Sequence, residues 1–242
     1  MNCIKLSVIT ATFNRAEILK NNLKSVSEQS FNNIEHIIVD NNSHDDTEKI
    51  VNNYKKNAKY PVIYIREADT GIYNAFNKGI RIVRGEWIHF LNSDDCYYSE
   101  NALSKIFEES YNEYDLIVCP VIVKKKDLNN NTWYPRFNKK LNHYYFPHTG
   151  TFFKKSFFDK VGLYNEKFKI ISDSIFGIKN YPKAKYIILN SPTVIMSDSG
   201  KSSEISLVNI YERLLSISVF HKMPIIHKIK LILELFYEII SK

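Results

Sequence analysis

Cysteine, glycine and proline are scarce in this sequence, which has 3 Cys, 7 Gly and 7 Pro among 242 residues. So few glycines and prolines argue against a collagen-like chain and against a long disordered linker. Cys3, Cys96 and Cys119 lie far apart, without a CxxC motif or a histidine cluster near them. A disulfide framework and a structural zinc site are therefore not expected, and this cysteine usage fits a reducing compartment.

Long apolar segments are also missing. The sequence has no run of about 18 consecutive apolar residues, so it predicts no helix that crosses a bilayer by itself. Residues Met1 to Lys5 lead directly into a strand-like segment and lack the apolar core of a signal peptide. We therefore expect a cytoplasmic protein.

Glycine-rich phosphate-binding motifs do not occur either. Neither GxGxxG nor GxxxxGK[ST] is present in the sequence. Their absence disfavours a Rossmann-type dehydrogenase and a P-loop nucleotide hydrolase. If the protein binds a diphosphate, its charge must be neutralised in another way.

Charge is unevenly distributed along the chain, whose formal net charge is +7. Residues 1–120 hold 13 Lys and Arg against 17 Asp and Glu, whereas residues 121–242 hold 20 against 9. A basic half points to an anionic partner, either nucleic acid or a membrane surface, or else only keeps the protein soluble. Charge alone favours neither interpretation.

The first 120 residues alternate between strand-like and helix-like patterns. Apolar, β-branched runs predict strands at 6–10, 34–40, 61–66, 87–91 and 116–123. Apolar residues at spacings of three and four predict helices at 18–26, around 50–54, at 72–83 and at 102–109. Such alternation indicates βαβ units and a mostly parallel sheet, which is an α/β fold. The regularity fades after residue 124.

Polar and acidic residues follow the predicted strands at their carboxyl ends, where ligands bind in open parallel sheets. These segments are Thr10-Ala11-Thr12, Asp40-Asn41-Asn42-Ser43, Glu67 to Gly71, and Asn92-Ser93-Asp94-Asp95. Adjacent carboxylates at Asp94 and Asp95 suit a divalent cation such as Mg²⁺ or Mn²⁺ that bridges phosphate oxygens. From spacing alone, a turn that caps the next helix is the stronger explanation of this pair.

Several motif blocks resemble a known enzyme family. The blocks LSVITATFNRAEILKNNLKSVSEQSFNNIEHIIVDNNSHDDT, EADTGIYNAFNKGI and GEWIHFLNSDD stand in the order and spacing typical of family 2 glycosyltransferases. Residues 148–154 and 171–173 resemble the subgroup that builds bacterial surface polysaccharides such as O-antigen and capsule. The resemblance implies a GT-A fold, with a Rossmann-like, mostly parallel sheet and flanking helices, and it makes a metal–nucleotide site the better explanation of the paired carboxylates.

The resemblance also implies roles for individual residues. It places the nucleotide at Thr10, Ala11, Thr12, Asn14, Asp40, Asn42, Ser43, Asp69, Lys78 and Asp94, with Asp40 accepting a hydrogen bond from uracil. It places the donor sugar or the acceptor at Gly71, Tyr73, Asn74 and His148. Asp94 and Asp95 would hold Mn²⁺ or Mg²⁺, and Asp173 would be the catalytic base. Without the resemblance, Asp173 would be interpreted as a helix cap and His148 equally well as a structural histidine.

Some positions depart from the family pattern. Ala11 replaces a common proline, Asn41 and Asn42 replace glycines, Thr70 replaces lysine, Asn74 replaces aspartate, and Asn92 replaces the first acid of the DxD motif. None of these changes removes the expected metal ligand or the base. They leave the identity of the donor sugar open, because loop 69–74 is expected to touch it.

The expected organisation is a catalytic domain at 1–200, with a nucleotide-binding half at 1–120 and an acceptor-binding half at 121–200, followed by a helical extension at 201–242. The expected activity is transfer of one sugar, with inversion, from a UDP-sugar to an undecaprenyl-diphosphate-linked glycan at the inner face of the bacterial membrane. The alternatives are a nucleotidyltransferase and a non-enzymatic basic module that binds membrane or nucleic acid. The scattered lysines form no nucleic-acid-binding motif, so no nucleic acid partner is expected.

The C-terminal extension has the pattern of an amphipathic helix broken near Pro224. Its apolar residues recur at spacings of three and four, at Ile225, Ile226, Ile229, Ile232, Leu233, Phe236, Tyr237 and Ile240. Such an apolar face must be covered by the catalytic domain, by a second copy in a homodimer, or by a membrane interface. Contact with protein is the stronger expectation, and peripheral membrane contact is the functional alternative.

Overall fold

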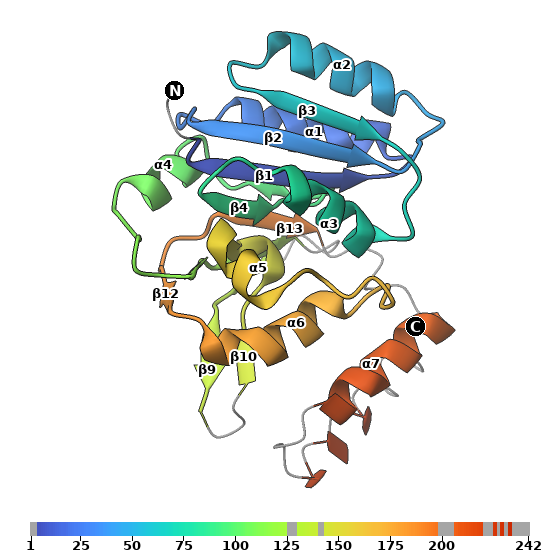
Figure 1. Ribbon diagram of the computed structural model, residues 1–242, viewed down its shortest axis with the longest axis vertical. Helices are drawn as coiled ribbons and strands as arrows, with labels where there is room; N and C mark the ends of the chain where they lie inside the picture. Colours follow the sequence, from blue (N-terminus) through green and yellow to red (C-terminus); the bar gives the residue numbers. More distant parts are fainter. Residues whose placement is uncertain are drawn as a thin grey trace.

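A seven-stranded sheet forms the centre of the protein, in a computed structural model (Figure 1). The structure describes residues 4–124, 130–139, 143–197 and 206–219, together with 225, 226, 228, 229, 232 and 233. The strand order is β12-β6-β11-β4-β1-β2-β3. These strands are β1 (Leu6–Thr12), β2 (Ile34–Asp40), β3 (Val62–Arg66), β4 (Trp87–Phe90), β6 (Leu116–Val118), β11 (Thr151–Lys154) and β12 (Tyr186–Ile188).

Most neighbouring strands of this sheet run parallel, as the alternating pattern predicts. β1 pairs in parallel with β2 and with β4, β2 with β3, and β12 with β6. β11 is antiparallel to both of its neighbours, β4 and β6. The predicted α/β class with a mostly parallel sheet is confirmed.

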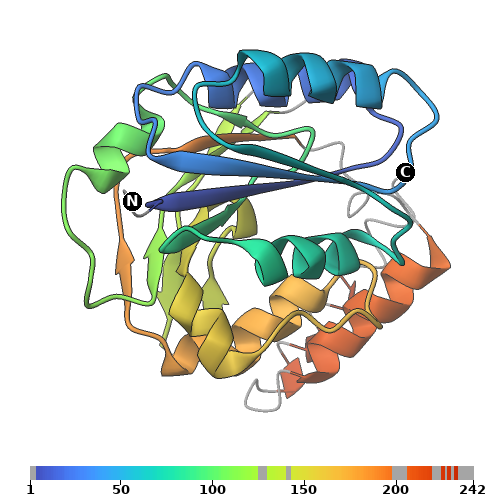
Figure 2. The same cartoon turned by 45° about the horizontal axis from the view of Figure 1, so that its top comes forward.

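Helices cover both faces of the sheet, as Figure 2 shows. One face packs against α1 (Ala16–Ser27) and α2 (Thr47–Asn57), and the other against α3 (Ile72–Ile82), α5 (Lys155–Val161) and α6 (Ser172–Asn180). β1 alternates between these two cores, since Leu6 and Val8 join the α1 and α2 side and Ile9 joins the α3 side. Burial on both faces explains why the first strands read as almost continuous apolar runs. The short helix α4 (Ala102–Phe107) packs in the first core.

The strand predicted at 116–123 is wrong in one respect, because the structure divides it into two strands in different sheets. β6 ends at Val118, and β7 (Val121–Lys124) enters a four-stranded sheet of order β5-β13-β7-β8. Pro120 lies at the break, and its nitrogen has no hydrogen to donate to a ladder. The other strands of the small sheet are β5 (Cys96–Tyr97), β8 (Asn131–Trp133) and β13 (Val194–Ser197).

The remaining elements build the lower half of the molecule in Figure 1. They are the hairpin β9 (Arg136–Asn138) and β10 (His143–Tyr145), the 3₁₀ turns η1 (His148–Gly150) and η2 (Tyr181–Lys183), and the helix α7 (Leu207–Val219). α7 contacts α6. Residues 225, 226, 228, 229, 232 and 233 are helical, and the rest of the predicted amphipathic segment lies outside the described residues. Within the described part of the chain, no helix is both long enough and apolar enough to span a membrane.

Two histidines are fully buried in the central sheet. Nδ1 and Nε2 of His36 lie 2.8 Å from the Tyr54 hydroxyl and 3.0 Å from the Thr10 hydroxyl. His89 lies between the Tyr97 hydroxyl at 2.9 Å and the Thr149 carbonyl at 2.8 Å, to which its Nε2 must donate. Burial lowers the pKa of each histidine to about 3. Both are therefore neutral structural residues at pH 7.

Acid should destabilise the protein through these histidines. As pH falls from about 6.5 towards 3, the unfolded chain takes up protons on them and the folded chain does not, so each histidine lowers the free energy of unfolding by up to about 1.4 kcal/mol per pH unit. We expect His89→Gln to be less stable at pH 7 but to lose stability less steeply on acidification. Urea unfolding between pH 7 and 4 measures this, with exposed His44→Gln as the control. A gap between His89→Gln and wild type that stays constant with pH would contradict it.

Candidate active site

The ends of β1 and β2 form one side of the candidate site, where Thr12 pairs with Asp40 in the parallel register. Thr10 is buried, and its hydroxyl donates to the Leu91 carbonyl at 2.7 Å. Ala11 is half-buried, and the Oγ1 of Thr12 is buried without a hydrogen-bond partner. Of the three residues predicted in β1, Thr10 therefore forms its hydrogen bond inside the sheet. Thr12, at the end of the strand, has a hydroxyl oxygen without a hydrogen-bond partner.

Asp40 is a buried carboxylate that organises the loop after β2. Its Oδ1 accepts hydrogen bonds from the Ser43 amide at 3.0 Å and the Ser43 hydroxyl at 2.5 Å, and its Oδ2 accepts one from the Tyr64 hydroxyl at 2.6 Å. Arg66 Nε lies 3.8 Å from Oδ2. These contacts therefore hold the Asp40 side chain in one position at the carboxyl end of β2, where it is buried.

Two asparagines shape the loops after β1 and β2, and one of them, Asn14, joins the two loops. Asn14 and Asn42 have positive φ values of 50° and 52°, a left-handed conformation that asparagine tolerates better than most residues. The Asn14 amide donates to the Ser43 hydroxyl at 2.8 Å, and Asn14 Oδ1 accepts from the His44 amide at 2.8 Å. Asn42 is thus conformationally suited to the place where the family commonly has glycine.

Asp94 follows β4 and is tied to the same loops. Its Oδ2 accepts a hydrogen bond from Nη1 of Arg15 at 2.9 Å, and Arg15 directly follows Asn14. A continuous set of contacts thus runs from Asp40 through Ser43, Asn14 and Arg15 to Asp94. The structure brings the predicted acids of β2 and β4 to one edge of the sheet, although Arg15 was not predicted as part of the site.

Asp95 points away from that edge into the protein. It is buried, its Oδ1 accepts from the Ser197 amide at 3.0 Å, and its Oδ2 accepts from Asn92 Nδ2 at 3.0 Å. Burial, and after it the charge of Asp94, raises the pKa of Asp95 to about 8. The two adjacent carboxylates therefore have different environments, and Asp94 is the more accessible one.

The oxygens at this edge fit a hard divalent cation whose shell is completed by a ligand. In the parts of the chain that the structure describes, no three His, Cys, Asp or Glu side chains are grouped to hold a metal by themselves. Asp94 offers a carboxylate at this edge, Asp95 is buried behind it, and Asn92 Oδ1 is buried without a hydrogen-bond partner, like Thr12 Oγ1. Mg²⁺ characteristically binds one or two carboxylates plus phosphate oxygens. This donor set suits such a cation together with a phosphate ligand.

The loop before α3 is held from both ends. The Asp69 amide donates to Asn41 Oδ1 at 2.7 Å, and Asp69 Oδ1 accepts from the Gly71 amide at 2.8 Å. Gly71 has a φ of 139°, which glycine adopts far more readily than other residues. Lys78 donates to the Ala68 carbonyl at 2.6 Å, so its ammonium group supports the loop from α3.

Asp173 lies in the first turn of α6 and is held by Tyr73 of α3. The Tyr73 hydroxyl is 2.8 Å from Asp173 Oδ1 and 2.6 Å from the Ile170 carbonyl. Asp173 Oδ1 also accepts from the Ser174 amide at 2.8 Å. Burial, and then the charge of Asp173, raises the pKa of Tyr73 well above its usual value, so Tyr73 remains a hydrogen-bond donor. Tyr73 and Asp173, which are 100 positions apart in the sequence, are thus in direct contact.

Asn74 and His148 are fixed by neighbours near this pair. Asn74 Nδ2 donates to Glu166 at 2.7 Å, a residue that also accepts from Asn77. His148 Nε2 lies 2.8 Å from the Tyr164 hydroxyl. Burial lowers the pKa of His148, and the charge of Asp173 partly opposes this shift. His148 is therefore a neutral residue beside the carboxylate.

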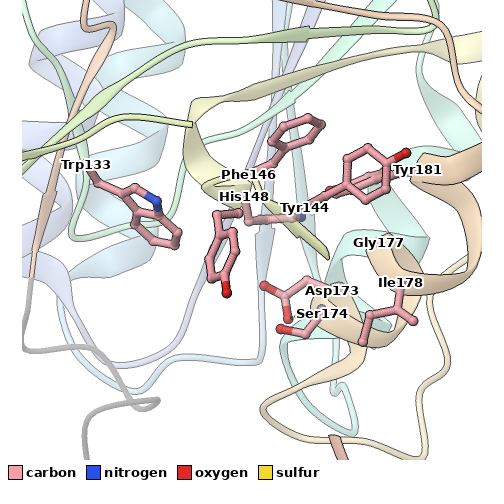
Figure 3. Close-up of a pocket in the computed structure, with 10 residues that line it drawn as sticks. Trp133, Tyr144, Phe146, His148, Asp173, Ser174, Gly177, Ile178 and Tyr181 are labelled. Carbon is pink, nitrogen blue, oxygen red and sulfur yellow. Dashed lines mark hydrogen bonds between the residues drawn. The ribbon is translucent and has the colours of Figure 1, made fainter. Parts of the chain in front are cut away.

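A cavity of about 230 Å³ opens beside Asp173 (Figure 3). Its walls come from β8, β10, η1, α6 and η2 and are mainly aromatic; they comprise Trp133, Tyr144, Tyr145, Phe146, His148, Asp173, Ser174, Gly177, Ile178 and Tyr181. Asp173 is the carboxylate of this lining. The structure thus joins two predicted residues, His148 and Asp173, with aromatic residues that sequence reasoning assigned no role. The available signal was the density of aromatic residues from 133 to 146.

Comparison with known families and proteins gives a consistent result. The family model described as Glycosyl transferase family 2 matches residues 7–182. A PGL/p-HBAD biosynthesis glycosyltransferase of Mycobacterium tuberculosis is 28% identical over 197 residues, which cover 79% of this chain and 75% of the relative. A GalNAc(5)-diNAcBac-PP-undecaprenol beta-1,3-glucosyltransferase of Campylobacter jejuni is 32% identical over 123 residues, covering 50% of this chain and 40% of the relative.

Solved structures show the same fold. TarS of S. aureus, residues 1–349 in complex with UDP-GlcNAc, superposes with a TM-score of 0.73 at 19% identity, covering 98% of this chain and 73% of TarS. The mannosyltransferase PcManGT from Pyrobaculum calidifontis, in complex with GDP-Man and Mn²⁺, superposes with a TM-score of 0.66 at 15% identity, covering 96% of this chain and 68% of the other. Both likenesses confirm the predicted GT-A fold.

Proposed function

The chain belongs to glycosyl transferase family 2, and we propose that it transfers one sugar from a UDP-sugar to a lipid-linked glycan in the synthesis of a bacterial surface polysaccharide. The observation that supports this best is the position of Asp173, which lines the aromatic cavity and is held by Tyr73. Membership of this family sets aside the nucleotidyltransferase and the non-enzymatic binding module considered from the sequence.

Asp173 has the properties of a general base. The acceptor hydroxyl gives its proton to the Asp173 carboxylate while its oxygen bonds to the anomeric carbon. The bond from that carbon to the diphosphate oxygen breaks in the same step, so the configuration inverts and no covalent intermediate forms. Tyr73 and the Ser174 amide hold one oxygen of Asp173 and so orient its carboxylate.

The nucleotide is proposed to bind at the strand ends, between the loops that begin at Asn14, Asp40 and Asp69. TarS, which shares the fold, is known in complex with UDP-GlcNAc and with UDP. The buried Asp40 carboxylate is the acceptor proposed for the uracil N–H, with Asn42 and Ser43 near the base or ribose. Thr12, Gly71 and Lys78 complete this side.

Asp94 is the residue proposed to hold Mn²⁺ or Mg²⁺, with Asp95 and Asn92 behind it. The shared fold with PcManGT, known with GDP-Man and Mn²⁺, supports a divalent cation. When bound, the metal would neutralise negative charge on the leaving diphosphate. Arg15 forms an ion pair with Asp94 at 2.9 Å, and this position beside the proposed metal ligand supports a role for Arg15 in contacting the same phosphates.

The acceptor is proposed to enter the aromatic cavity. Binding pockets for organic ligands are characteristically apolar and aromatic, with a few polar groups that orient the ligand. Here Trp133, Tyr144 and Tyr181 supply ring faces for a sugar, and Asp173 and Ser174 supply the polar groups. The Campylobacter relative, named for an undecaprenol-linked substrate, supports a lipid-linked acceptor.

Replacing the base tests this function directly. Asp173→Asn keeps an oxygen for Tyr73 and Ser174 but cannot take a proton, so transfer should fall by about 10²–10⁴ while UDP affinity is unchanged. The measurement is UDP release from a panel of UDP-sugars with Mn²⁺ and a lipid-linked glycan. Exposed Asp159→Asn on α5 is the control and should leave the rate unchanged. Near-normal turnover by Asp173→Asn would show that another group is the base.

The two adjacent acids should differ in their effect on the metal. Because Asp94 is the more accessible, Asp94→Asn should weaken Mn²⁺-dependent UDP binding roughly 100-fold, and Asp95→Asn less than about tenfold. Calorimetric titration of UDP with and without Mn²⁺ measures both variants. The opposite order would assign the metal to Asp95, and UDP binding that ignores Mn²⁺ would remove the metal from the proposal.

The C-terminal helical residues are proposed to contact an anionic membrane surface. Ile225, Ile226 and Leu233 are 75%, 65% and 61% exposed, and the basic half of the chain favours anionic lipid. The full chain should co-sediment with vesicles that contain phosphatidylglycerol, and Ile225→Glu with Ile226→Glu should prevent this. Co-sedimentation unchanged by the substitutions, or a dimer that they dissociate in analytical ultracentrifugation, would overturn the membrane contact.

A further inference from the structure

Glu212 of α7 is a buried acid in direct contact with the turn that precedes the base. Its side chain is 4% exposed. Oε1 accepts a hydrogen bond from the Lys169 amide at 2.7 Å, and Oε2 accepts from the Ile170 amide at 2.8 Å and the Ile171 amide at 3.2 Å. Three successive backbone N–H groups thus converge on one carboxylate from a helix about 40 residues further along the chain.

The three N–H groups of this turn are suited to bind a carboxylate such as that of Glu212. Successive N–H groups that point into one concavity bind anions, and hydrogen bonds to a carboxylate are about twice as strong as neutral ones. A buried carboxylate without such partners would be strongly unfavourable. Glu212 is the acid of α7, whose sequence is LVNIYERLLSISV. The hydrogen bonds from the amides of residues 169–171 to Glu212 therefore fix where α7 contacts this turn, which apolar packing of the helix alone would not do.

The same turn is also held by the loop before α3 and by α3 itself. The Ile170 carbonyl lies 2.6 Å from the Tyr73 hydroxyl, which also contacts Asp173. The Lys169 ammonium group donates to the Thr70 carbonyl. The turn at 169–171 is thus fixed through its amides by α7 and through its carbonyl and side chain by residues 70–73, two residues before Asp173.

We propose that Glu212 is a positioning residue for Asp173 and that α7 supports the active site through this residue. The proposal rests on the proposed function, in which Asp173 is the base. Glu212 fixes the backbone at 169–171, this backbone fixes the first turn of α6, and that turn sets where the Asp173 carboxylate lies relative to Tyr73 and the cavity. Residue 212 lies beyond residues 7–182 matched by the family model, so the family pattern assigns it no role.

Glu212→Gln tests the proposal with two independent readouts. Glutamine keeps the size of the side chain but replaces one accepting oxygen by a donor. Hydrogen exchange at the amides of 169–171 should become at least about tenfold faster. The kcat for sugar transfer should fall about 10²-fold, because a small displacement of a catalytic group is costly, while the Kd for UDP with Mn²⁺ is unchanged. Glu17→Gln is the matched control, since Glu17 is 80% exposed and pairs with Lys20 on the surface.

Glu212→Asp provides a second variant in case Glu212→Gln does not fold. It keeps the charge, shortens the side chain by one methylene, and should give an intermediate loss of amide protection and of kcat. Unchanged exchange at 169–171, or faster exchange with an unchanged kcat, would overturn the positioning role. If wild type transfers no sugar from any donor, the proposed function fails, whereas faster exchange in Glu212→Gln still establishes that Glu212 holds this turn.

Discussion

Parallel pairing of β1 with β2 on one side and with β4 on the other brings three strand ends to the same edge of the sheet. Each of these strands is followed by a polar loop, so groups that are up to 80 residues apart in sequence meet there. The polar residues of the loops then satisfy one another: Ser43 links Asn14 to Asp40, and Arg15 links the first loop to Asp94. The edge is therefore ordered before any ligand binds, which reduces the entropic cost of binding.

The second half of the site depends on long-range contacts of a different kind. Asp173 is contacted by α3 through Tyr73, and the turn before it is contacted by α7 through Glu212. The loop before α3 reaches the same turn through the hydrogen bond from the Lys169 ammonium group to the Thr70 carbonyl. The nucleotide side and the base side of the proposed site are thus connected through one short stretch of backbone, so a change on either side can reach the other.

Hydrophobic periodicity is sufficient to predict β1 to β4 and the helices between them, because β1, β2 and β4 are buried on both faces and the helices on one. It does not predict the antiparallel direction of β11, which depends on partners elsewhere in the chain, and it misses the break at Pro120 because the apolar run continues across this residue. Motif resemblance points to Asp94 and Asp173. It gives no indication of Arg15, just before α1, or of Glu212 on α7, because a charged residue is usually solvated and only the folded chain shows what it contacts.

The antiparallel strand β11 also constrains the order in which the sheet can be completed. β11 lies between β4 and β6, so β6 and β12 have no direct ladder to the first four strands. During synthesis, β1 to β4 can pair as soon as the first 90 residues have emerged, whereas β6 must wait for a strand that begins at Thr151. The β4 edge therefore has no partner strand until about 60 more residues have been made, and an unpaired strand edge is a template for incorrect pairing.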